Sequence, residues 1–107
     1  MKVRLAEFID SKDIWKWRND KHTRSMFIDN KYIYWQNHSN WFQKALKSNK
    51  ILIYIGLLKN KKIGVVRFDI DKSSKRALVS LNLNPIMRGK NLSYLLLLNS
   101  INEFKKE

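Results

Sequence analysis

Short apolar runs and amphipathic segments alternate along the chain. Four runs of leucine and β-branched residues either alternate with polar residues or are nearly continuous, and both patterns are typical of strands. They predict strands over residues 2–8, 51–58, 62–70 and 76–84. Three other segments place apolar side chains three and four positions apart, as amphipathic helices do. They predict helices over residues 10–20, 35–47 and 92–104, with an irregular segment over residues 21–34.

Individual residues mark where several of these elements begin, bend or end. Asp10 or Ser11 is suited to cap the first helix, because a short polar side chain can accept a hydrogen bond from its unpaired amides. Gly64 interrupts an otherwise apolar strand and predicts a bulge. Pro85 lacks an amide hydrogen, so we expect the last strand to end before it. The last helix is expected to bury a wide apolar face made of Leu92, Tyr94, Leu95, Leu96, Leu97, Leu98, Ile101 and Phe104.

Length and composition indicate a single α+β domain. A chain of 107 residues with 44% hydrophobic residues suits one core, so residues 1–107 are assigned to one domain. The chain has no cysteine and its two histidines are far apart in sequence, so we expect neither disulfides nor a metal site. No stretch approaches the roughly 20 apolar residues of a membrane span. Residues 1–4 also lack the apolar core of a signal peptide, so we expect a cytoplasmic protein that does not contact membranes.

The formal net charge of +13 allows two interpretations. Basic proteins attract polyanions, so nucleic acid is one candidate partner. The lysines are nevertheless scattered through the chain instead of collecting on one helix, and no recognisable RNA- or DNA-binding module is present. We therefore prefer a solvated basic surface, or one that steers an acidic ligand, and keep nucleic-acid binding as a weaker alternative.

The segment from Ser80 to Asn99 joins a strand, a basic turn and an apolar helix. The first turn of a helix leaves several amides unpaired and carries partial positive charge. Gly89 allows a ligand to approach the backbone closely, and Arg88 and Lys90 add two positive charges. This combination suits a phosphate or pyrophosphate. A basic loop without a ligand is the simpler alternative.

The residues of this turn resemble those of a known family. Arg-Gly-Lys-Asn-Leu-Ser, over residues 88–93, resembles the acetyl-CoA pyrophosphate loop of the GNAT superfamily of N-acetyltransferases, including members that act on amino-sugar nucleotides or ribosomal proteins. Residues 88–90 fit the start of the family pattern, whereas Asn91 stands where a glycine is common and Ser93 where Gly or Ala is usual. The resemblance covers essentially the whole chain. It implies a mostly antiparallel sheet with the order strand-helix-helix-strand-strand-strand-helix.

Two earlier segments resemble family members that act on amino-sugar nucleotides. Trp17-Arg18-Asn19-Asp20 resembles the end of their first helix, which implies that Arg18 and Asn19 face the acceptor. His38, in the pattern His-x-x-Trp-Phe, resembles the sugar-type members, which implies contact with the substrate. From spacing alone, His38 is better explained as a packed, hydrogen-bonded core residue. The two polar residues are equally well explained as part of an exposed helix surface with Trp17 buried.

The resemblance also implies where the coenzyme binds. The backbone of Leu81 and Leu83 would pair with the pantetheine arm of acetyl-CoA, as an added strand does. The acceptor amine would attack the thioester, and a backbone N–H would stabilise the developing oxyanion. Ser80 and Asn82 would line the cleft or orient a water that acts as base, unless they are simply solvent-facing polar positions. The pyrophosphate would be held by the amides of Arg88, Gly89, Lys90, Asn91, Leu92 and Ser93.

One departure from the family concerns the end of the chain. GNAT enzymes normally continue with a further strand, helix and hairpin, which usually supply the far wall of the cleft and a tyrosine that acts as general acid. An uncovered last strand invites pairing, so we expect a homodimer or a complementing chain.

Three hypotheses follow. The first is an acetyl-CoA-dependent N-acetyltransferase that acts on a primary amine of a small acceptor, with an amino-sugar nucleotide as one candidate. The second is a truncated, catalytically incomplete fragment that only binds coenzyme or a partner. The third is a small basic nucleic-acid-binding domain.

Overall fold

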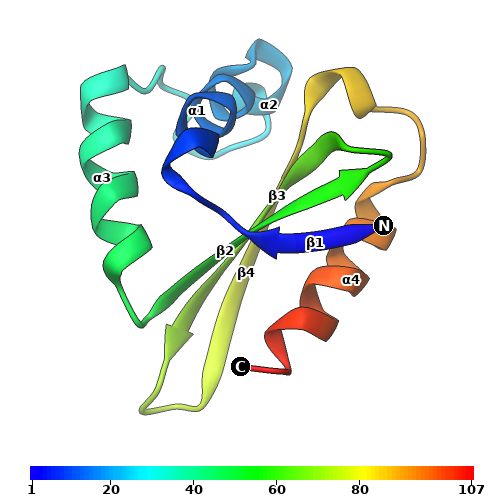
Figure 1. Cartoon of the computed structure of the whole chain (residues 1–107). Coiled ribbons are helices and arrows are strands. Elements are labelled where there is room, and N and C mark those ends of the chain that lie inside the picture. Colours follow the sequence, from blue (N-terminus) through cyan, green and yellow to red (C-terminus); the bar gives the residue numbers. More distant parts are fainter.

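The computed structural model describes residues 1–107 as a four-stranded antiparallel sheet with helices on both faces (Figure 1). The strands are adjacent in sequence order, so β1 and β4 form the two edges. None of the helices is both long and apolar enough to cross a membrane. The strands are β1 (Lys2–Leu5), β2 (Ile51–Leu58), β3 (Lys61–Asp71) and β4 (Arg76–Leu83). The helices are α1 (Ser11–Asn19), α2 (Lys21–Ser25), α3 (Trp35–Lys47) and α4 (Ser93–Phe104).

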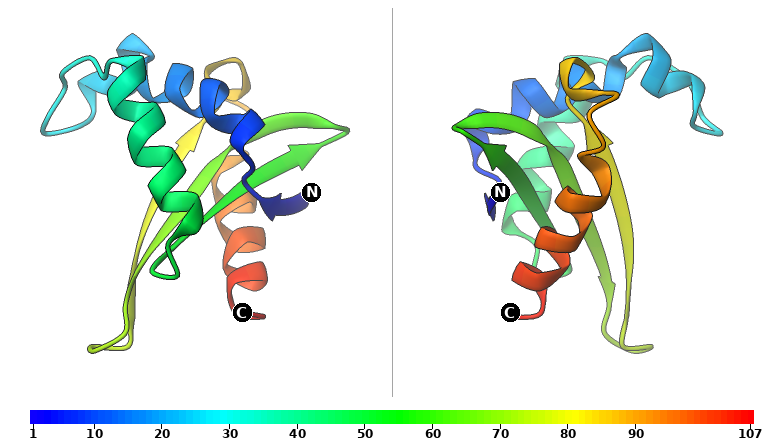
Figure 2. Two further views of the ribbon diagram at one scale, coloured as in Figure 1. Left: turned by 60° about the vertical axis from the view of Figure 1, so that its left-hand side comes forward. Right: turned by 90° about the vertical axis from the view of Figure 1, so that its right-hand side faces the viewer.

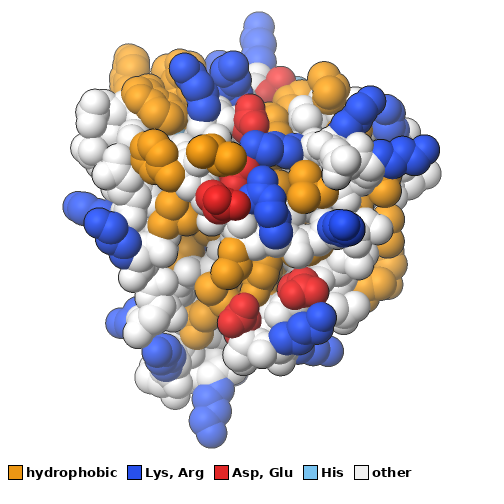
Figure 3. Space-filling view, in the orientation of Figure 1, with side chains coloured by type: hydrophobic (Ala, Val, Ile, Leu, Met, Phe, Trp, Pro, Cys, Tyr) orange, Lys and Arg blue, Asp and Glu red, His pale blue; other side chains and the backbone are white.

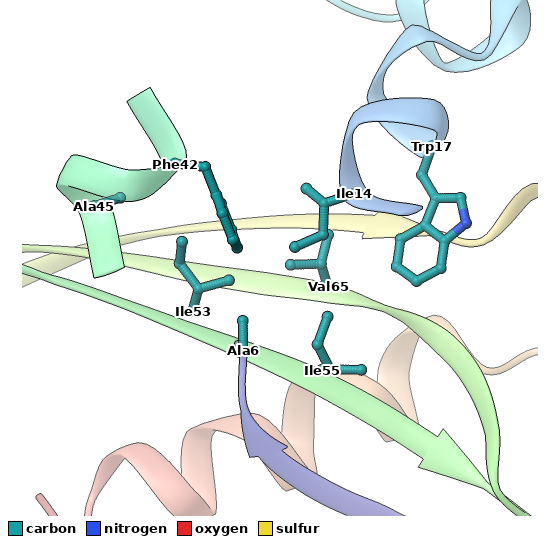
Figure 4. Packing of buried hydrophobic residues seen from close by; sticks show 8 residues of the cluster. All are labelled: Ala6, Ile14, Trp17, Phe42, Ala45, Ile53, Ile55 and Val65. Atoms are coloured by element: carbon teal, nitrogen blue, oxygen red, sulfur yellow. The ribbon is translucent and has the colours of Figure 1, made fainter. Parts of the chain in front are cut away.

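Two apolar cores lie on opposite faces of this sheet, one under α1 and α3 and the other under α4 (Figure 2). Successive residues of a strand point to opposite faces, so the nearly continuous apolar runs of β2 and β3 contribute to both cores. Ile53, Ile55 and Val65 pack with Ile14 and Phe42 in the first core (Figure 4). The second core contains Tyr54, Ile63, Val66, Phe68, Met87 and Leu96. The α+β class predicted from the sequence is confirmed.

The segment predicted to be irregular, residues 21–34, contains the short helix α2. This helix begins after Asp20, whose side chain accepts a hydrogen bond from the Thr23 amide at 3.1 Å. A capped first turn of this kind stabilises a helix that is too short to be recognised from apolar periodicity. Residues 26–34 form a loop, as expected.

Asp10 does not cap α1, contrary to the prediction, and Ser11 does not cap it either. The Asp10 carboxylate is fully buried and accepts hydrogen bonds from the two terminal Arg4 nitrogens at 2.8 and 2.9 Å and from the Glu7 amide at 2.8 Å. Lys62 Nζ lies 2.7 Å from the same carboxylate. Burial alone would raise the pKa of Asp10, but the hydrogen bonds from Arg4 and Lys62 outweigh it and hold the pKa well below its usual range.

Gly64 lies beside a bulge rather than at its extra residue. The pairing of β2 with β3 shifts after Gly56, which leaves Ile63 as the additional residue. Gly56 and Gly64 are paired across the two strands. A Cβ atom on Gly64 would lie 2.5 Å from the Asn82 carbonyl oxygen and 3.0 Å from Leu96 Cδ2. Glycine here therefore lets β4 and α4 lie close to β3.

The buried face of α4 is narrower than the sequence predicted. Leu96 is fully buried, and the Phe104 ring stacks on Phe68 with ring centroids 4.2 Å apart. Tyr94, by contrast, is 73% exposed, and Leu95 and Leu98 are also exposed. A helix on one layer of sheet buries only one side of its surface, so a leucine-rich composition overestimates the buried face.

Candidate active site

A cavity of about 430 Å³ lies on the α1 and α3 face of the sheet, beside the edge strand β4. Its apolar wall includes Ile14, Ile53 and Val65, which also belong to the first core. Its polar wall consists of Arg18, Asn37, His38, Arg67, Ser80 and Asn82. An apolar pocket with a few convergent polar groups is the usual form of a small-molecule site.

Five of the residues singled out in the sequence meet at this cavity. Arg18 comes from α1, His38 from α3, and Ser80, Leu81 and Asn82 from β4. Ser80 and Asn82 pair with Arg67 and Val65 of β3 and share their face of the sheet, so their polar side chains line the cavity.

Asn19 does not line the cavity. Its side chain instead holds the loop over residues 26–34: Nδ2 donates to the Ile33 carbonyl at 2.8 Å, and the Ile33 amide donates to Oδ1 at 2.8 Å. Trp15 Nε1 donates to the same carbonyl at 2.7 Å. Because Ile33 and Phe27 of this loop line the cavity, Asn19 contributes to its shape indirectly.

The positive charge and the hydrogen-bond donors of Arg18 have few partners in the protein. Its Nη1 atom is buried without a hydrogen-bond partner, and its guanidinium lies 3.9 Å from the centre of the Phe27 ring. Burial lowers the pKa of Arg18, and the nearby charges of Arg67 and Arg24 lower it further, against the opposing effect of Asp29.

His38 is at once a core residue and a cavity residue. It is almost fully buried, and its ring stacks on Phe42. Nε2 lies 3.0 Å from the Ser11 carbonyl oxygen, so this nitrogen carries the hydrogen and donates. Burial lowers the pKa of His38, although the hydrogen bond to Ser11 opposes this effect. His38 is therefore neutral at pH 7, and its Nδ1 carries a lone pair.

The outer edge of β4 offers unpaired backbone groups. The Asn84 amide donates to the Ile63 carbonyl at 2.8 Å, and hydrogen-bonded pairs alternate with non-bonded pairs along an antiparallel ladder. Leu83 and Leu81 fall on the non-bonded positions opposite Gly64 and Val66. Their N–H and C=O groups consequently point away from β3, toward an edge that has no neighbouring strand.

β4 leads into α4 through a turn that has room for a ligand. Gly89 and Asn91 have positive φ angles of 75° and 57°. Apart from Gly89 and its two chain neighbours, no residue has an atom within 4 Å of the position where a Cβ would sit on Gly89. α4 begins at Ser93, and no side chain caps its first amides. Lys90 is exposed at the same turn. These features form an open, basic N-terminus on α4, a helix of twelve residues.

The Arg88 side chain points away from this turn. Its Nη2 atom contacts the Asp20 carboxylate and donates to Thr23 Oγ1 at 2.6 Å. The hydrogen bond from Arg88 is the main reason why the pKa of Asp20 is lowered. Arg88 thus ties the turn before α4 to the junction of α1 and α2. Its amide donates to the Pro85 carbonyl at 3.3 Å, so neither its side chain nor its amide is free to meet a ligand at this turn.

Several cavity residues were not expected from the sequence, and Arg67 is the most informative of them. Phe27, Ile33, Asn37 and Trp41 were also missed, since loops and helix surfaces give no signal of which residues converge. Arg67 did carry a signal, because it is a charged residue within an apolar strand. It lies two positions after buried Val65, so it points to the same face of the sheet.

Comparison with known proteins places this geometry in context. No protein-family model matches the chain, and no curated protein matches its sequence. Among solved structures, spermidine N-acetyltransferase from Vibrio cholerae in complex with CoA and spermine is similar with a TM-score of 0.82 and 17% identity, over 94% of this chain and 61% of that chain. A mutant of the same enzyme gives a TM-score of 0.77 and 18% identity, over 95% and 62% of the two chains.

The present chain therefore spans about three fifths of the length of these enzymes. At this level of identity the similarity establishes the fold. The chain has the GNAT acetyltransferase fold over the part that aligns with the spermidine N-acetyltransferases it resembles.

Proposed function

We propose that the protein is an acetyl-CoA-dependent N-acetyltransferase that acts on a primary amine of a small acceptor. The observation that carries this proposal is the position of the cavity against β4, whose free backbone edge leads directly into the open turn before α4. An acceptor in the cavity and a coenzyme along the edge would then meet at β4.

The residues of this edge fit the coenzyme. Leu81 and Leu83 offer unpaired N–H and C=O groups to the amide-containing pantetheine arm. The amides from Gly89 to Ser93 and the charge of Lys90 suit the pyrophosphate, because the first turn of α4 is uncapped and Gly89 leaves open space. Acetyl-CoA supplies the activated acetyl group in this arrangement.

The chain's own groups would act on the acceptor. A free N–H on the edge of β4 is placed to stabilise negative charge that develops on a carbonyl oxygen. Ser80 and Asn82 would orient a water that accepts the proton of the attacking amine, and neutral His38 would contact the acceptor from the opposite wall.

Binding of acetyl-CoA, measured by calorimetry, tests the coenzyme site. Lys90→Ala is expected to weaken binding about tenfold, because it removes one charge from the proposed pyrophosphate site. Lys105→Ala, which removes an exposed lysine beyond the far end of α4, is the matched control and should bind as the parent does. The proposal fails if the parent protein does not bind acetyl-CoA, or if both variants bind it equally well.

A second candidate is coenzyme binding without catalysis. It is favoured by the wall of the cavity, which contains neither a carboxylate nor a tyrosine to act as general acid. Release of free thiol from acetyl-CoA in the presence of amines separates the two functions. Thiol release that depends on the amine supports the transferase, whereas binding without release supports the second candidate.

Nucleic-acid binding has less support. Lys and Arg side chains are spread around the visible face instead of forming one patch, and acidic side chains lie among them (Figure 3). A groove or stripe of one sign of charge is what nucleic-acid binding requires.

We also propose that β4 pairs with a second copy of the chain or with a complementing chain. Leu78 and Val79, in the first half of β4, are 70% and 39% exposed, next to an edge without a neighbour. The second half of the strand, from Leu81, would remain available to the coenzyme.

A further inference from the structure

The charges that line the cavity are all positive. Arg18 and Arg67 contribute guanidinium groups from two different elements, and no Asp or Glu lines the cavity. Arg67 has one acidic partner, Asp69, which accepts a hydrogen bond from Arg67 Nε at 2.9 Å and forms no ion pair with another cation. The terminal nitrogens of Arg67 donate no hydrogen bond, and the guanidinium lies 5.2 Å from the centre of the Trp41 ring.

Arg18 has still less compensation. It forms no ion pair, and Asp29, whose charge raises the pKa of Arg18 against the effect of burial, does not line the cavity. Nη1 is buried without a hydrogen-bond partner. Its guanidinium lies over the Phe27 ring, which attracts the positive charge but supplies no acceptor oxygen. A guanidinium nitrogen that is buried without an acceptor is costly even on a half-buried side chain, and the second positive charge of Arg67 adds to the cost. An anion bound in the cavity would remove both penalties.

The remaining wall suits the rest of such a ligand. Trp41 and Phe27 add aromatic rings to the wall, and Ser80, Asn82 and Asn37 offer neutral polar groups. A cavity of about 430 Å³ is large enough for a small metabolite.

Resting on the function proposed above, we infer that the acceptor amine carries an anionic group, a phosphate or a carboxylate, which Arg18 and Arg67 bind together. This acceptor class differs from spermine, the polycation present in the complex of the structurally similar enzyme. A polyamine would bring several positive charges against two guanidinium groups, with no carboxylate in the cavity wall to receive them.

Two matched pairs of amines test this inference by calorimetry, without any need for catalysis. O-phosphoethanolamine and ethanolamine differ in the phosphate, and 4-aminobutyrate and butylamine differ in the carboxylate. We expect at least one anionic amine to bind about tenfold or more tightly than its neutral counterpart, and to bind more tightly than spermidine. Comparison of the two pairs shows which anion the cavity prefers.

Variants then locate the anion site. Arg18→Gln and Arg67→Gln should each weaken binding of the preferred anionic amine about tenfold and leave binding of its neutral counterpart unchanged. Arg18→Lys, which keeps the charge, should restore part of the affinity. Lys50→Gln removes an exposed charge outside the cavity and is the control. Far-UV circular dichroism of each variant verifies that it is folded.

Three results would overturn the inference. These are tighter binding of spermidine than of either anionic amine, equal binding within both pairs, and a preference that survives both arginine substitutions. This test is independent of the coenzyme test. An arginine-dependent preference for anionic amines without any binding of acetyl-CoA would contradict the transferase proposal and support the anion site. Binding of acetyl-CoA without this preference would contradict the anion site and leave the transferase proposal standing.

Discussion

At the scale of single residues, Asp10 shows how a buried charge links distant parts of the chain. Its carboxylate joins Arg4 of β1 and Lys62 of β3, and Lys62 also contacts Asp13 of α1 at 2.9 Å. A buried carboxylate is tolerated only when its oxygens are satisfied, and here each oxygen has a cationic partner. The cluster therefore fixes the start of α1 against the sheet.

Asp10→Asn is expected to lower the free energy of unfolding by about 3 kcal/mol, because it leaves Arg4 and Lys62 without their shared counter-charge. Urea unfolding followed by circular dichroism measures the change. Asp71→Asn removes an exposed carboxylate from the last residue of β3 and should cost less than about 1 kcal/mol. Equal losses in the two variants would show that the cluster does not stabilise the fold.

The lowered pKa of Asp10 predicts that the stability of the protein falls in acid. The pKa of Asp10 is lower in the folded than in the unfolded protein, so its contribution is fully present above the unfolded value of about 3.9. The contribution is lost as the pH falls below that value toward the lowered pKa of the folded state. Between about pH 5 and pH 2 the parent should therefore lose stability more steeply than Asp10→Asn. Parallel curves for the two proteins would contradict this assignment.

At the scale of elements, the contact of β3, β4 and α4 depends on glycine. Leu96 of α4 packs over Gly56 and Gly64, and the Asn82 carbonyl lies beside Gly64. The same contact places β4, and with it Ser80 and Asn82, along the cavity.

Gly64→Ala is expected to destabilise the protein by about 2 kcal/mol, because the added methyl group meets a backbone oxygen that can move only with β4. Gly89→Ala is the matched comparison. Its methyl group enters open space, and only the positive φ angle opposes it, at a cost of about 1 kcal/mol. Thermal unfolding of both variants shows which loses more stability. A smaller loss of stability in Gly64→Ala than in Gly89→Ala would show that β4 moves easily at this point.

At the scale of the whole molecule, an exposed strand edge competes with a high net charge. β4 offers unpaired backbone groups and exposed Leu78 and Val79, which favour association. The net charge of +13 repels a second copy, and salt screens this repulsion over a Debye length of about 8 Å at physiological ionic strength.

We therefore expect the fraction of dimer in sedimentation velocity to rise with salt and protein concentration. Leu78→Lys should reduce this fraction, because a lysine on an edge strand opposes pairing. Ile28→Lys adds the same charge at an exposed position of the loop over residues 26–34 and serves as the control. If the two variants dissociate equally, general charge repulsion and not the β4 edge is responsible.

The sequence by itself determined the order and type of the main elements. The apolar runs of β2 and β3 and the helical spacing of α3 are strong local patterns, so their predicted bounds agree closely with the structure. The strand, turn and apolar helix around Gly89 were also readable, since Pro85, Gly89 and the leucines act through local backbone geometry. The pairing of Arg18, His38, Ser80 and Asn82 at one site was expected only from the resemblance to GNAT enzymes.

Tertiary structure alone decided what each of these side chains contacts. It directed Asp10 to Arg4 and Lys62 instead of the helix end, and Arg88 to Asp20 instead of the turn. It also brought Arg67 to the cavity beside Arg18. Periodicity tells which face of an element is apolar, but ion pairs and cavities join residues that are tens of positions apart. Their formation depends on how the layers pack, which no local pattern encodes.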